Sequence, residues 1–378
     1  MSAPRLSVPA PVLPGRVHII GSGLIGTSLA MALVKAGVVV SVADASPTNE
    51  ALAADLSGAR LGAADPVDLV VVATPPDVTA EVVAGALTQW PHAVVTDVAS
   101  VKQIVLDELA TRQVAGLERY VGGHPMAGRE RSGAIAARID LFEGRPWVVT
   151  LVAETDRSAA ALVCGTAEAA GATVRVLTPQ DHDAAVAAVS HVPQIAASLV
   201  AARLAELSED AVGLSGTGIR DVTRIAASDP LLWTQILTGN ARAVAQVLRD
   251  LAGDLSGLVA ALEQLAEATT PDGRIEAPGA RAVLAKAIAA GNTGHARIPG
   301  KHGAAPAAYS IVTVLIPDKP GQLGRLFQDV ADAGINLEEL NLEHNLGQQF
   351  GQLELSVLPA AASELTDVLR ARGWRVHD

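Results

Sequence analysis

The sequence is poor in aromatic residues, in cysteine and in positive charge, and each shortage excludes a class of protein. Aromatic residues are 2% of the 378, so the core must be built largely from Leu, Val, Ile and Ala. The one cysteine, Cys164, allows no intramolecular disulfide, fits a reducing compartment and lies in an alanine-rich run typical of a core. With 28 basic against 40 acidic residues and no basic block, the chain, of net charge −12, is a poor candidate for nucleic-acid binding.

An uninterrupted membrane-spanning run is missing too. Residues 1–14 are rich in proline and have no apolar segment of the signal-peptide kind, so we expect a disordered tail. The most apolar run, residues 184–204, carries Ser190, His191 and Gln194 in its middle, which would be costly in lipid. We therefore expect a buried helix there, and a cytoplasmic protein without a membrane span.

Short valine-rich runs separated by helical segments fill residues 15–178. The runs are continuously apolar, which is typical of strands buried on both faces of a parallel sheet. They lie at residues 17–20, 38–46, 67–76, 92–100, 145–154 and 171–179. The sequence therefore predicts an α/β protein whose first domain is a Rossmann-type, doubly wound parallel sheet.

The pattern changes twice after this domain. Residues 179–292 have helical periodicity and propensity throughout, and they are more apolar than one isolated helix stack needs, which indicates a homodimer. Residues 293–307 are rich in Gly, Pro and Ala and are predicted to be a linker. Residues 308–378 read as strand, helix, two strands, helix and strand, the βαββαβ order of a ferredoxin-like unit.

A glycine motif, G-x-G-x-x-G, stands between the first strand and the following helix. It consists of Gly21, Gly23 and Gly26, with Leu24 and Ile25 opening the helix. In this context it predicts a dinucleotide site: the first glycine permits the tight turn, the second a close approach of the pyrophosphate, and the third close helix packing. The helix N-terminus would face the phosphates.

Two further features select the cofactor. Asp44 follows the motif about 20 residues on, where a carboxylate accepts hydrogen bonds from the ribose hydroxyls and repels a 2′-phosphate. NAD is therefore favoured over NADP. Thr74 and Pro75 follow the third predicted strand, where a loop would line the cofactor. No metal site is predicted.

Two side chains are candidates for the chemistry. Ser100 ends the fourth predicted strand, at the edge that faces the ligand crevice; it could hold a hydroxyl or carboxamide, cap the next helix, or do both. His124 lies in "GGHPMAG", where we interpret the glycines as permitting unusual backbone angles and Pro125 as stiffening a turn that aims the ring. A neutral imidazole in a crevice can accept a proton from a substrate hydroxyl.

Polar residues in the helical region complete a candidate pocket. His191 stands within an Ala/Val run, and Arg220 and Arg224 are one helical turn apart. Arginine grips carboxylates through two parallel hydrogen bonds. The alternative for Arg224 is an ion pair, with candidate partners Asp221, Asp229 and Glu130.

Taken together, these segments resemble the prephenate dehydrogenase family of tyrosine biosynthesis. The matching pieces are "GSGLIGTSLA", "VTDVASVK", "GGHPMAGRERSG", "HDAAVAAVSHVPQ", "DVTRIAASDPLLW" and "PDKPGQLGRLFQDVADAGIN". They span nearly the whole chain in the family's order, and the last resembles an ACT domain, a regulatory module that commonly binds amino acids. The resemblance implies that prephenate and NAD⁺ give 4-hydroxyphenylpyruvate, CO₂ and NADH.

The resemblance also implies roles for single residues. His124 would bind and polarise the C4 hydroxyl, and Ser100 would orient that hydroxyl and the nicotinamide. Arg224 would be the carboxylate clamp, His191 a pocket histidine, and Glu130 a carboxylate that pairs with Arg224.

The chain departs from the family pattern at two positions. Gln194 stands where members often carry a second histidine, and Arg129 where many have a small hydroxyl residue. A neutral Gln194 and a positive Arg129 favour prephenate over arogenate, which carries an ammonium group. An arogenate dehydrogenase of the same layout, or another NAD-dependent hydroxy-acid dehydrogenase, remains the alternative.

In the C-terminal unit, the "PDKPGQLG" loop is the expected effector site. Asp318, Pro320 and Gly321 would leave backbone groups open to the ends of an amino acid, with Asn336 completing the site. Family analogy predicts feedback by tyrosine. The alternative is that this unit only helps dimerisation, since an exposed sheet edge pairs readily.

Overall fold

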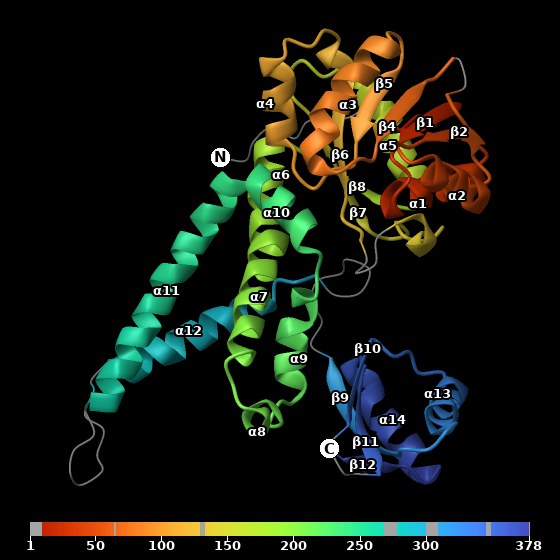
Figure 1. Cartoon of the computed structure of the whole chain (residues 1–378). Coiled ribbons are helices and arrows are strands. Elements are labelled where there is room, and N and C mark those ends of the chain that lie inside the picture. Colours follow the sequence, from red (N-terminus) through yellow and green to blue (C-terminus); the bar gives the residue numbers. More distant parts are fainter. Residues whose placement is uncertain are drawn as a thin grey trace. The chain divides into compact units, whose positions relative to one another are not determined.

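A computed structural model describes residues 10–63, 66–128, 133–267, 277, 279–299, 309–344 and 349–377. The chain forms two compact units that divide between Gly253 and Asp254. Each unit is built around a β-sheet of its own (Figure 1).

The first unit contains an eight-stranded sheet. Its strands lie side by side in the order β3-β2-β1-β4-β5-β6-β7-β8, and all neighbours are parallel except β6 and β7. The strands are β1 (Arg16–Ile20), β2 (Val39–Ala43), β3 (Arg60–Leu61), β4 (Leu69–Val72), β5 (Val94–Asp97), β6 (Tyr120–Pro125), β7 (Pro146–Thr150) and β8 (Thr173–Leu177). The predicted Rossmann-like parallel sheet is confirmed, with one antiparallel pair near the β8 edge.

Helices cover both faces of this sheet (Figure 1). One face packs against α1 (Leu24–Lys35), α2 (Pro47–Ser57) and α5 (Arg157–Ala169), and the other against α3 (Pro76–Gln89) and α4 (Gln103–Thr111). Short 3₁₀ turns lie at Leu117–Arg119 and Ala134–Ala136. Cys164 is a buried free thiol in α5, so its predicted core position is confirmed.

The predicted turn around His124 is wrong, because "YVGGHP" is strand β6. Neither glycine has a positive φ. Both are needed for space: a Cβ on Gly122 would lie 2.5 Å from Thr150 Oγ1, and one on Gly123 would lie 2.6 Å from the Asp97 carbonyl oxygen. The glycines therefore let neighbouring strands approach β6, and His124 is aimed by a strand end.

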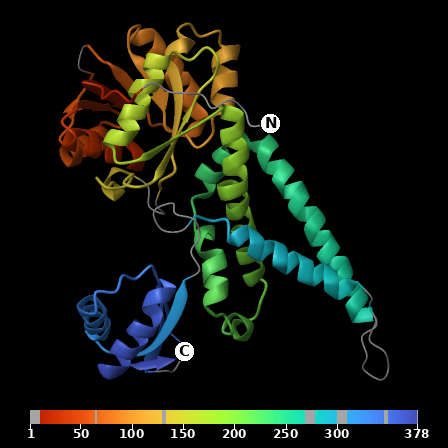
Figure 2. The same cartoon turned by 180° about the vertical axis from the view of Figure 1, so that it is seen from behind.

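The chain then becomes helical, as predicted. Its elements are α6 (Pro179–Val186), a π-helical turn (Ala187–His191), α7 (Val192–Leu204), α8 (Glu209–Val212), α9 (Thr217–Thr223), a 3₁₀ turn (Arg224–Ala226), α10 (Pro230–Gly239) and α11 (Ala241–Glu267), which crosses the division between the units. Helix α9 lies beside α7 in both views (Figures 1 and 2). A small core forms where Ala187 and Val192 meet Val244.

One described run, Pro179–Leu204, is long and apolar enough to cross a membrane by length and composition alone. Its most apolar 18-residue window is 33% buried, so the expected buried helix is buried only in part. His182, Asp183 and His191 are buried and hydrogen-bonded within the same unit. Charged and polar groups of this kind are costly in lipid.

The second unit has a four-stranded antiparallel sheet in the order β10-β11-β9-β12. Its elements are α12 (Ala280–His295), β9 (Ser310–Pro317), α13 (Gln322–Asp332), β10 (Glu339–His344), β11 (Phe350–Val357), α14 (Pro359–Ala371) and β12 (Arg375–His377). From β9 onward this is the expected βαββαβ order. Leu326, Leu355 and Leu365 are at the centre of its core.

The predicted domain limits at residues 14, 178, 292 and 307 stay a prediction. Two observations bear on their details. Within the expected tail, residues 10–14 lie against α5, where Val12 N donates to the Ala161 carbonyl at 3.0 Å. Helix α12 continues to His295, inside the expected linker.

Candidate active site

The three glycines of the motif do two different jobs. Gly21 has a φ of +102°, and a Cβ there would lie 2.4 Å from the Ala73 carbonyl oxygen. A Cβ on Gly26 would lie 2.0 Å from the carbonyl oxygen of Gly21. Both are therefore required by the protein's own packing. Gly23 is different, since nothing lies within 4 Å of a Cβ built on it.

The open space at Gly23 fits a dinucleotide. Gly23 is the N-cap of α1 and supplies no side-chain cap, so the helix begins with backbone N–H groups that its cap leaves unpaired. Leu24 and Ile25 open this helix. An uncapped helix N-terminus beside empty space is the environment that a pyrophosphate requires. The residues present therefore fit the cofactor.

Asp44 stands just beyond β2, and its carboxylate accepts three hydrogen bonds. Ser22 donates from its backbone N at 2.7 Å and its Oγ at 2.8 Å, and Ser46 N donates at 2.8 Å. Burial works to raise the pKa of Asp44, but these hydrogen bonds outweigh it and lower the pKa below its usual value. Asp44 is therefore a carboxylate at neutral pH, the form that discriminates against a 2′-phosphate.

The loop after β4 lies against the glycine motif. The backbone of Ala73 is the nearest neighbour of Gly21, and Ala73 N donates to the Ile20 carbonyl at 2.7 Å. Thr74 is half-buried beside Thr79, and the exposed Pro75 is the N-cap of α3. Thr74 and Pro75 are therefore next to the cradle.

Exchanging Gly23 and Gly26 separately for alanine is expected to separate binding from folding. Gly23→Ala fills only open space, so we expect an unchanged unfolding midpoint and a large loss of NAD⁺ affinity by titration. Gly26→Ala must displace backbone, so we expect a loss of about 1–3 kcal/mol of stability or more. Equal NAD⁺ affinity in Gly23→Ala and the parent protein would contradict the assignment of the cradle.

His124 is the outer member of a chain of hydrogen bonds. Its Nδ1 lies 2.8 Å from His182 Nε2, and His182 Nδ1 lies 2.8 Å from Asp183 Oδ1. The Asp183 carboxylate also accepts the backbone N–H groups of Lys102 and Gln103, each at 2.9 Å. It thereby caps α4 from a different element, and α6 is fastened to the sheet beside His124.

Burial keeps these imidazoles neutral. It is the largest cause that lowers the pKa of His124 well below the usual value, and the neighbouring His182, Lys102 and His191 act in the same direction. Burial also lowers the pKa of His182, whereas the hydrogen bond that His182 donates to Asp183 acts to raise it. The pKa of His191 falls to about 4, again mainly through burial. At pH 7, His124 is therefore a neutral imidazole, with one N–H group and one nitrogen lone pair that can accept a proton.

A buried ion pair supports the strand that carries His124. Lys102 Nζ contacts Asp97 Oδ1 and also donates to the carbonyl oxygen of Gly123 at 2.7 Å. The other carboxylate oxygen of Asp97 accepts the Tyr120 hydroxyl at 2.6 Å. Lys102 and Asp97 are 1% and 0% exposed, so neither charge has water as an alternative partner.

The predicted helical-domain residues lie at the start of α7 and in the turn that contacts it. His191 is buried, and Asn240 Nδ2 donates both to its Nδ1 at 3.2 Å and to the Asp183 carbonyl at 2.7 Å. Gln194, also buried, accepts from Ser228 Oγ at 3.4 Å. Ser228 closely follows the 3₁₀ turn that begins at Arg224, so Gln194 is connected to that turn.

Arg224 is exposed. Within the described part of the chain it forms no ion pair, so the alternative of a salt bridge with Asp221 or Asp229 is wrong. The third candidate partner, Glu130, lies outside the described residues, as does Arg129.

Ser100 is half-buried in the bend after β5. The alternative that it caps the next helix is wrong, because α4 begins at Gln103 with Lys102 as N-cap, and Asp183 takes the free N–H groups. Among the described residues Ser100 Oγ has no hydrogen-bond partner, which leaves it open to a ligand.

Sequence reasoning missed His182, Asp183 and Asn240. The first two open the segment "HDAAVAAVSHVPQ", and the signal was there: an imidazole and a carboxylate are adjacent at the start of an otherwise apolar helix. Asn240 had no such signal, since a lone amide between two helices is a common helix boundary.

Comparison with known proteins places the chain in a family. Two family models match, "Prephenate dehydrogenase, nucleotide-binding domain" over residues 29–190 and "Prephenate dehydrogenase, dimerization domain" over residues 178–269. A probable prephenate dehydrogenase of Streptomyces niveus, NovF, is 38% identical over 360 residues, covering 94% of this chain and 98% of that protein.

Solved structures give the same result. The prephenate dehydrogenase of A. aeolicus, in complex with hydroxyphenyl propionate and NAD⁺, superposes with a TM-score of 0.63 at 28% identity, covering 74% of this chain and 97% of that one. A Synechocystis arogenate dehydrogenase gives 0.61 at 25% identity, covering 74% and 99%. Neither family model extends beyond residue 269, so both leave out the βαββαβ unit. From the glycine cradle, the imidazole chain and these matches, we conclude that the chain belongs to the prephenate dehydrogenase family.

Proposed function

We propose that this protein oxidises and decarboxylates prephenate with NAD⁺, giving 4-hydroxyphenylpyruvate, CO₂ and NADH. One observation carries the proposal: His124 lies near the end of strand β6 as a neutral imidazole whose Nδ1 is hydrogen-bonded to His182, while its Nε2 has no partner among the described residues. That is the arrangement of a general base waiting for a hydroxyl proton.

The residues divide the work as follows. Bound NAD⁺ supplies the acceptor for the hydride that leaves the carbinol C4. His124 Nε2 accepts the proton of the C4 hydroxyl as that C–H bond breaks. When the ring carboxylate leaves as CO₂, its bonding electrons complete the aromatic ring, and the proton returns from His124 to the ring oxygen. His124 therefore holds the proton only during the reaction, and no net proton is released.

Positioning falls to the remaining residues. We propose that the Ser100 hydroxyl orients the C4 hydroxyl and the nicotinamide. The exposed Arg224 guanidinium grips a substrate carboxylate, and a site that fixes its substrate in this way removes much of the entropy barrier. We propose that His191 and Gln194 contact the substrate, while Glu130 and Arg129, for which the family resemblance implies roles, lie outside the described residues.

A kinetic comparison of prephenate and arogenate, each with NAD⁺ and NADP⁺, tests this function. We expect a higher kcat/KM for prephenate, because Gln194 is neutral and offers an ammonium group no charged acceptor. We also expect a preference for NAD⁺, because Asp44 is ionised. Because the chain is also similar to an arogenate dehydrogenase, a higher kcat/KM for arogenate would show that we have assigned the wrong substrate. No turnover of either substrate would defeat the proposal.

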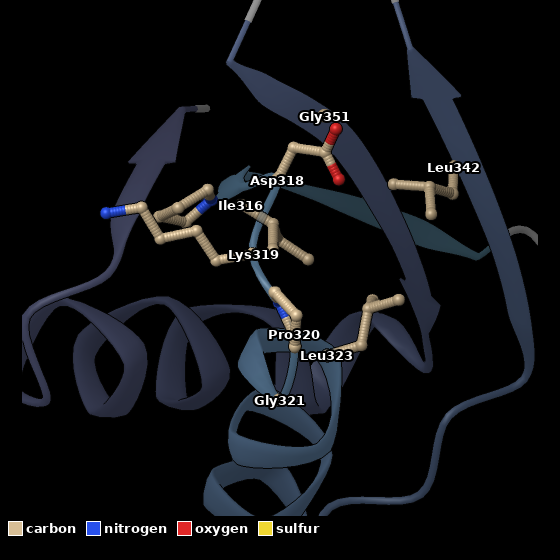
Figure 3. A pocket seen from close by; sticks show the side chains of 9 residues that line it. Ile316, Asp318, Lys319, Pro320, Gly321, Leu323, Leu342 and Gly351 are labelled. Carbon is tan, nitrogen blue, oxygen red and sulfur yellow. The ribbon is translucent and has the colours of Figure 1, made fainter.

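We further propose that residues 308–378 are an ACT domain that binds an amino acid. A cavity of about 300 Å³ lies at the start of α13 (Figure 3). Asp318, Pro320 and Gly321 line it, together with the apolar side chains of Ile316, Leu323 and Leu342. Asn336 is not among the lining residues and instead donates to Glu338 Oε1 at 2.8 Å.

The chemistry of this cavity supports an amino-acid effector. Asp318 offers a carboxylate to an ammonium group, and α13 begins at an N-cap glycine, Gly321, without a side-chain cap, which suits a carboxylate. The leucines suit an apolar side chain. Family analogy makes tyrosine the effector. The alternative is that this unit only helps dimerisation, through its exposed sheet edge.

Isothermal titration with tyrosine distinguishes these readings. We expect saturable heat and reduced turnover in the full chain, and a loss of both in Asp318→Ala with basal turnover retained. Titration with phenylalanine is the matched control for the phenolic hydroxyl. Absence of heat and of inhibition with tyrosine would leave dimerisation as the role of this unit.

The helical region is proposed to form a homodimer. The family model over residues 178–269 is that of a dimerization domain, and α7 exposes large apolar side chains, with Leu199 61% and Val200 38% exposed. A cytoplasmic location follows from the same proposal of a soluble biosynthetic enzyme.

A further inference from the structure

We infer that His182 and Asp183 are positioning residues that set the tautomer of His124, keeping its proton on Nδ1 and its lone pair on Nε2. The inference rests on the proposed role of His124 as the base. It adds that the base is effective because a second imidazole and a carboxylate dictate which of its nitrogens faces the substrate.

The hydrogen-bond chain fixes each proton in turn. Both oxygens of the Asp183 carboxylate accept backbone N–H groups, and a carboxylate can only accept, so His182 Nδ1 donates to Oδ1. A neutral His182 then has its lone pair on Nε2. His124 Nδ1, 2.8 Å away, must donate to that lone pair. The lone pair of His124 is therefore on Nε2.

The opposite order would disable the base. If His182 carried protons on both nitrogens, its Nε2 would donate to His124 Nδ1, and a neutral His124 would then hold its proton on Nε2. Such a ring offers the substrate hydroxyl a donor and cannot take its proton. The charged groups around the pair are Lys102, Asp97 and Asp183, and the titratable but neutral His191 lies beyond them. Burial of His182 keeps it in the neutral, productive form.

The anchoring of Asp183 makes the order rigid. Its carboxylate is held by the start of α4, and its carbonyl oxygen by Asn240, so it is fixed from two other elements. When the substrate O–H bond breaks and the His124 Nε2–H bond forms, the new imidazolium still donates from Nδ1 to His182. The anionic Asp183 behind it stabilises that charge, and the proton later returns to the substrate oxygen.

Two substitutions of His182 separate tautomer control from packing. The amide oxygen of His182→Gln can accept the Nδ1–H of His124, whereas His182→Leu fills the buried site but accepts nothing. We expect kcat with prephenate to fall about 10- to 100-fold in His182→Leu, and by less in His182→Gln. This is the usual effect of removing a residue that hydrogen-bonds a functional histidine. We expect KM to change little and the leucine variant to be at least as stable thermally. The exposed His92→Gln is the matched control.

A second measurement reads the tautomer directly. Nitrogen NMR of the imidazoles in the full chain should show His124 protonated on Nδ1 in the parent protein and a mixture of tautomers in His182→Leu. Equal kcat in the leucine and glutamine variants, or a His124 protonated on Nε2 in the parent protein, would overturn the inference. If His124→Asn lost activity while His182→Leu kept it, only this inference would fail; if His124→Asn kept full turnover, the proposed function of His124 would fail first.

Discussion

Replacing His124 by asparagine is expected to lower kcat with prephenate by about 10²- to 10⁴-fold, the usual contribution of a general base. The amide of asparagine is far less basic than an imidazole nitrogen, so the substrate hydroxyl must lose its proton without a general base. Steady-state production of NADH measures the effect.

Two controls make this result specific. NAD⁺ affinity should be unchanged, because the glycine cradle lies on β1 and α1, separate from β6 in the strand order. The thermal unfolding midpoint should remain near that of the parent protein, because His124 is only half-buried. Full turnover in this variant would mean that the catalytic group is another residue.

The second large effect concerns Lys102, whose replacement by methionine is expected to cost about 3–5 kcal/mol of stability. Methionine fills the volume but leaves the buried Asp97 carboxylate without its cation and the Gly123 carbonyl without its donor. Burial lowers the pKa of Lys102, and the charge of Asp97 opposes that shift, so the two groups depend on each other. Urea denaturation followed by tryptophan fluorescence measures the loss.

A matched variant distinguishes charge from shape. In Lys102→Met with Asp97→Asn, the charge of Asp97 is removed together with that of its partner, and the Tyr120 hydroxyl still has an acceptor, so we expect part of the stability to return. A loss below about 1 kcal/mol in Lys102→Met, the level of an exposed pair, would contradict the idea that the ion pair carries the strand.

The parts of the fold that could be predicted are those whose evidence is local. Gly21, Gly23 and Gly26 lie within one six-residue segment, and their spacing alone predicts a strand, a tight turn and a helix. The βαββαβ unit was equally readable, because its strands alternate polar and apolar residues and its helices end at glycine. In both cases the hydrophobic period within a single element decides the structure.

Strand β6 escaped prediction because its reason is tertiary. Two glycines and a proline around a histidine have turn propensity, and nothing in "YVGGHP" signals that Thr150 and Asp97 will press against it. The reversed direction of β7 and β8 was hidden for the same reason. Continuous valine runs indicate burial on both faces and say little about which way a strand runs.

The adjacent imidazole and carboxylate of His182 and Asp183 were visible in the sequence, but their approach to His191 and Asn240 could not be predicted, for a geometrical reason. His182 and His191 are nine residues apart, about two and a half turns of an α-helix, which places them on opposite faces. The π-helical turn at Ala187–His191 widens the coil and changes that phase. Asn240 can then touch both His191 and the Asp183 backbone. A regular helical wheel would have separated them.

The double engagement of Asp183 places a limit on how this protein can change. One carboxylate closes the open end of α4 and also holds the imidazole behind the proposed base. Any substitution of Asp183 would therefore both fray the start of α4 and misalign the imidazole of His124. Substitutions that shift the pH dependence of activity must therefore occur at neighbouring residues that have only one structural role. Asp183 itself can hardly be replaced.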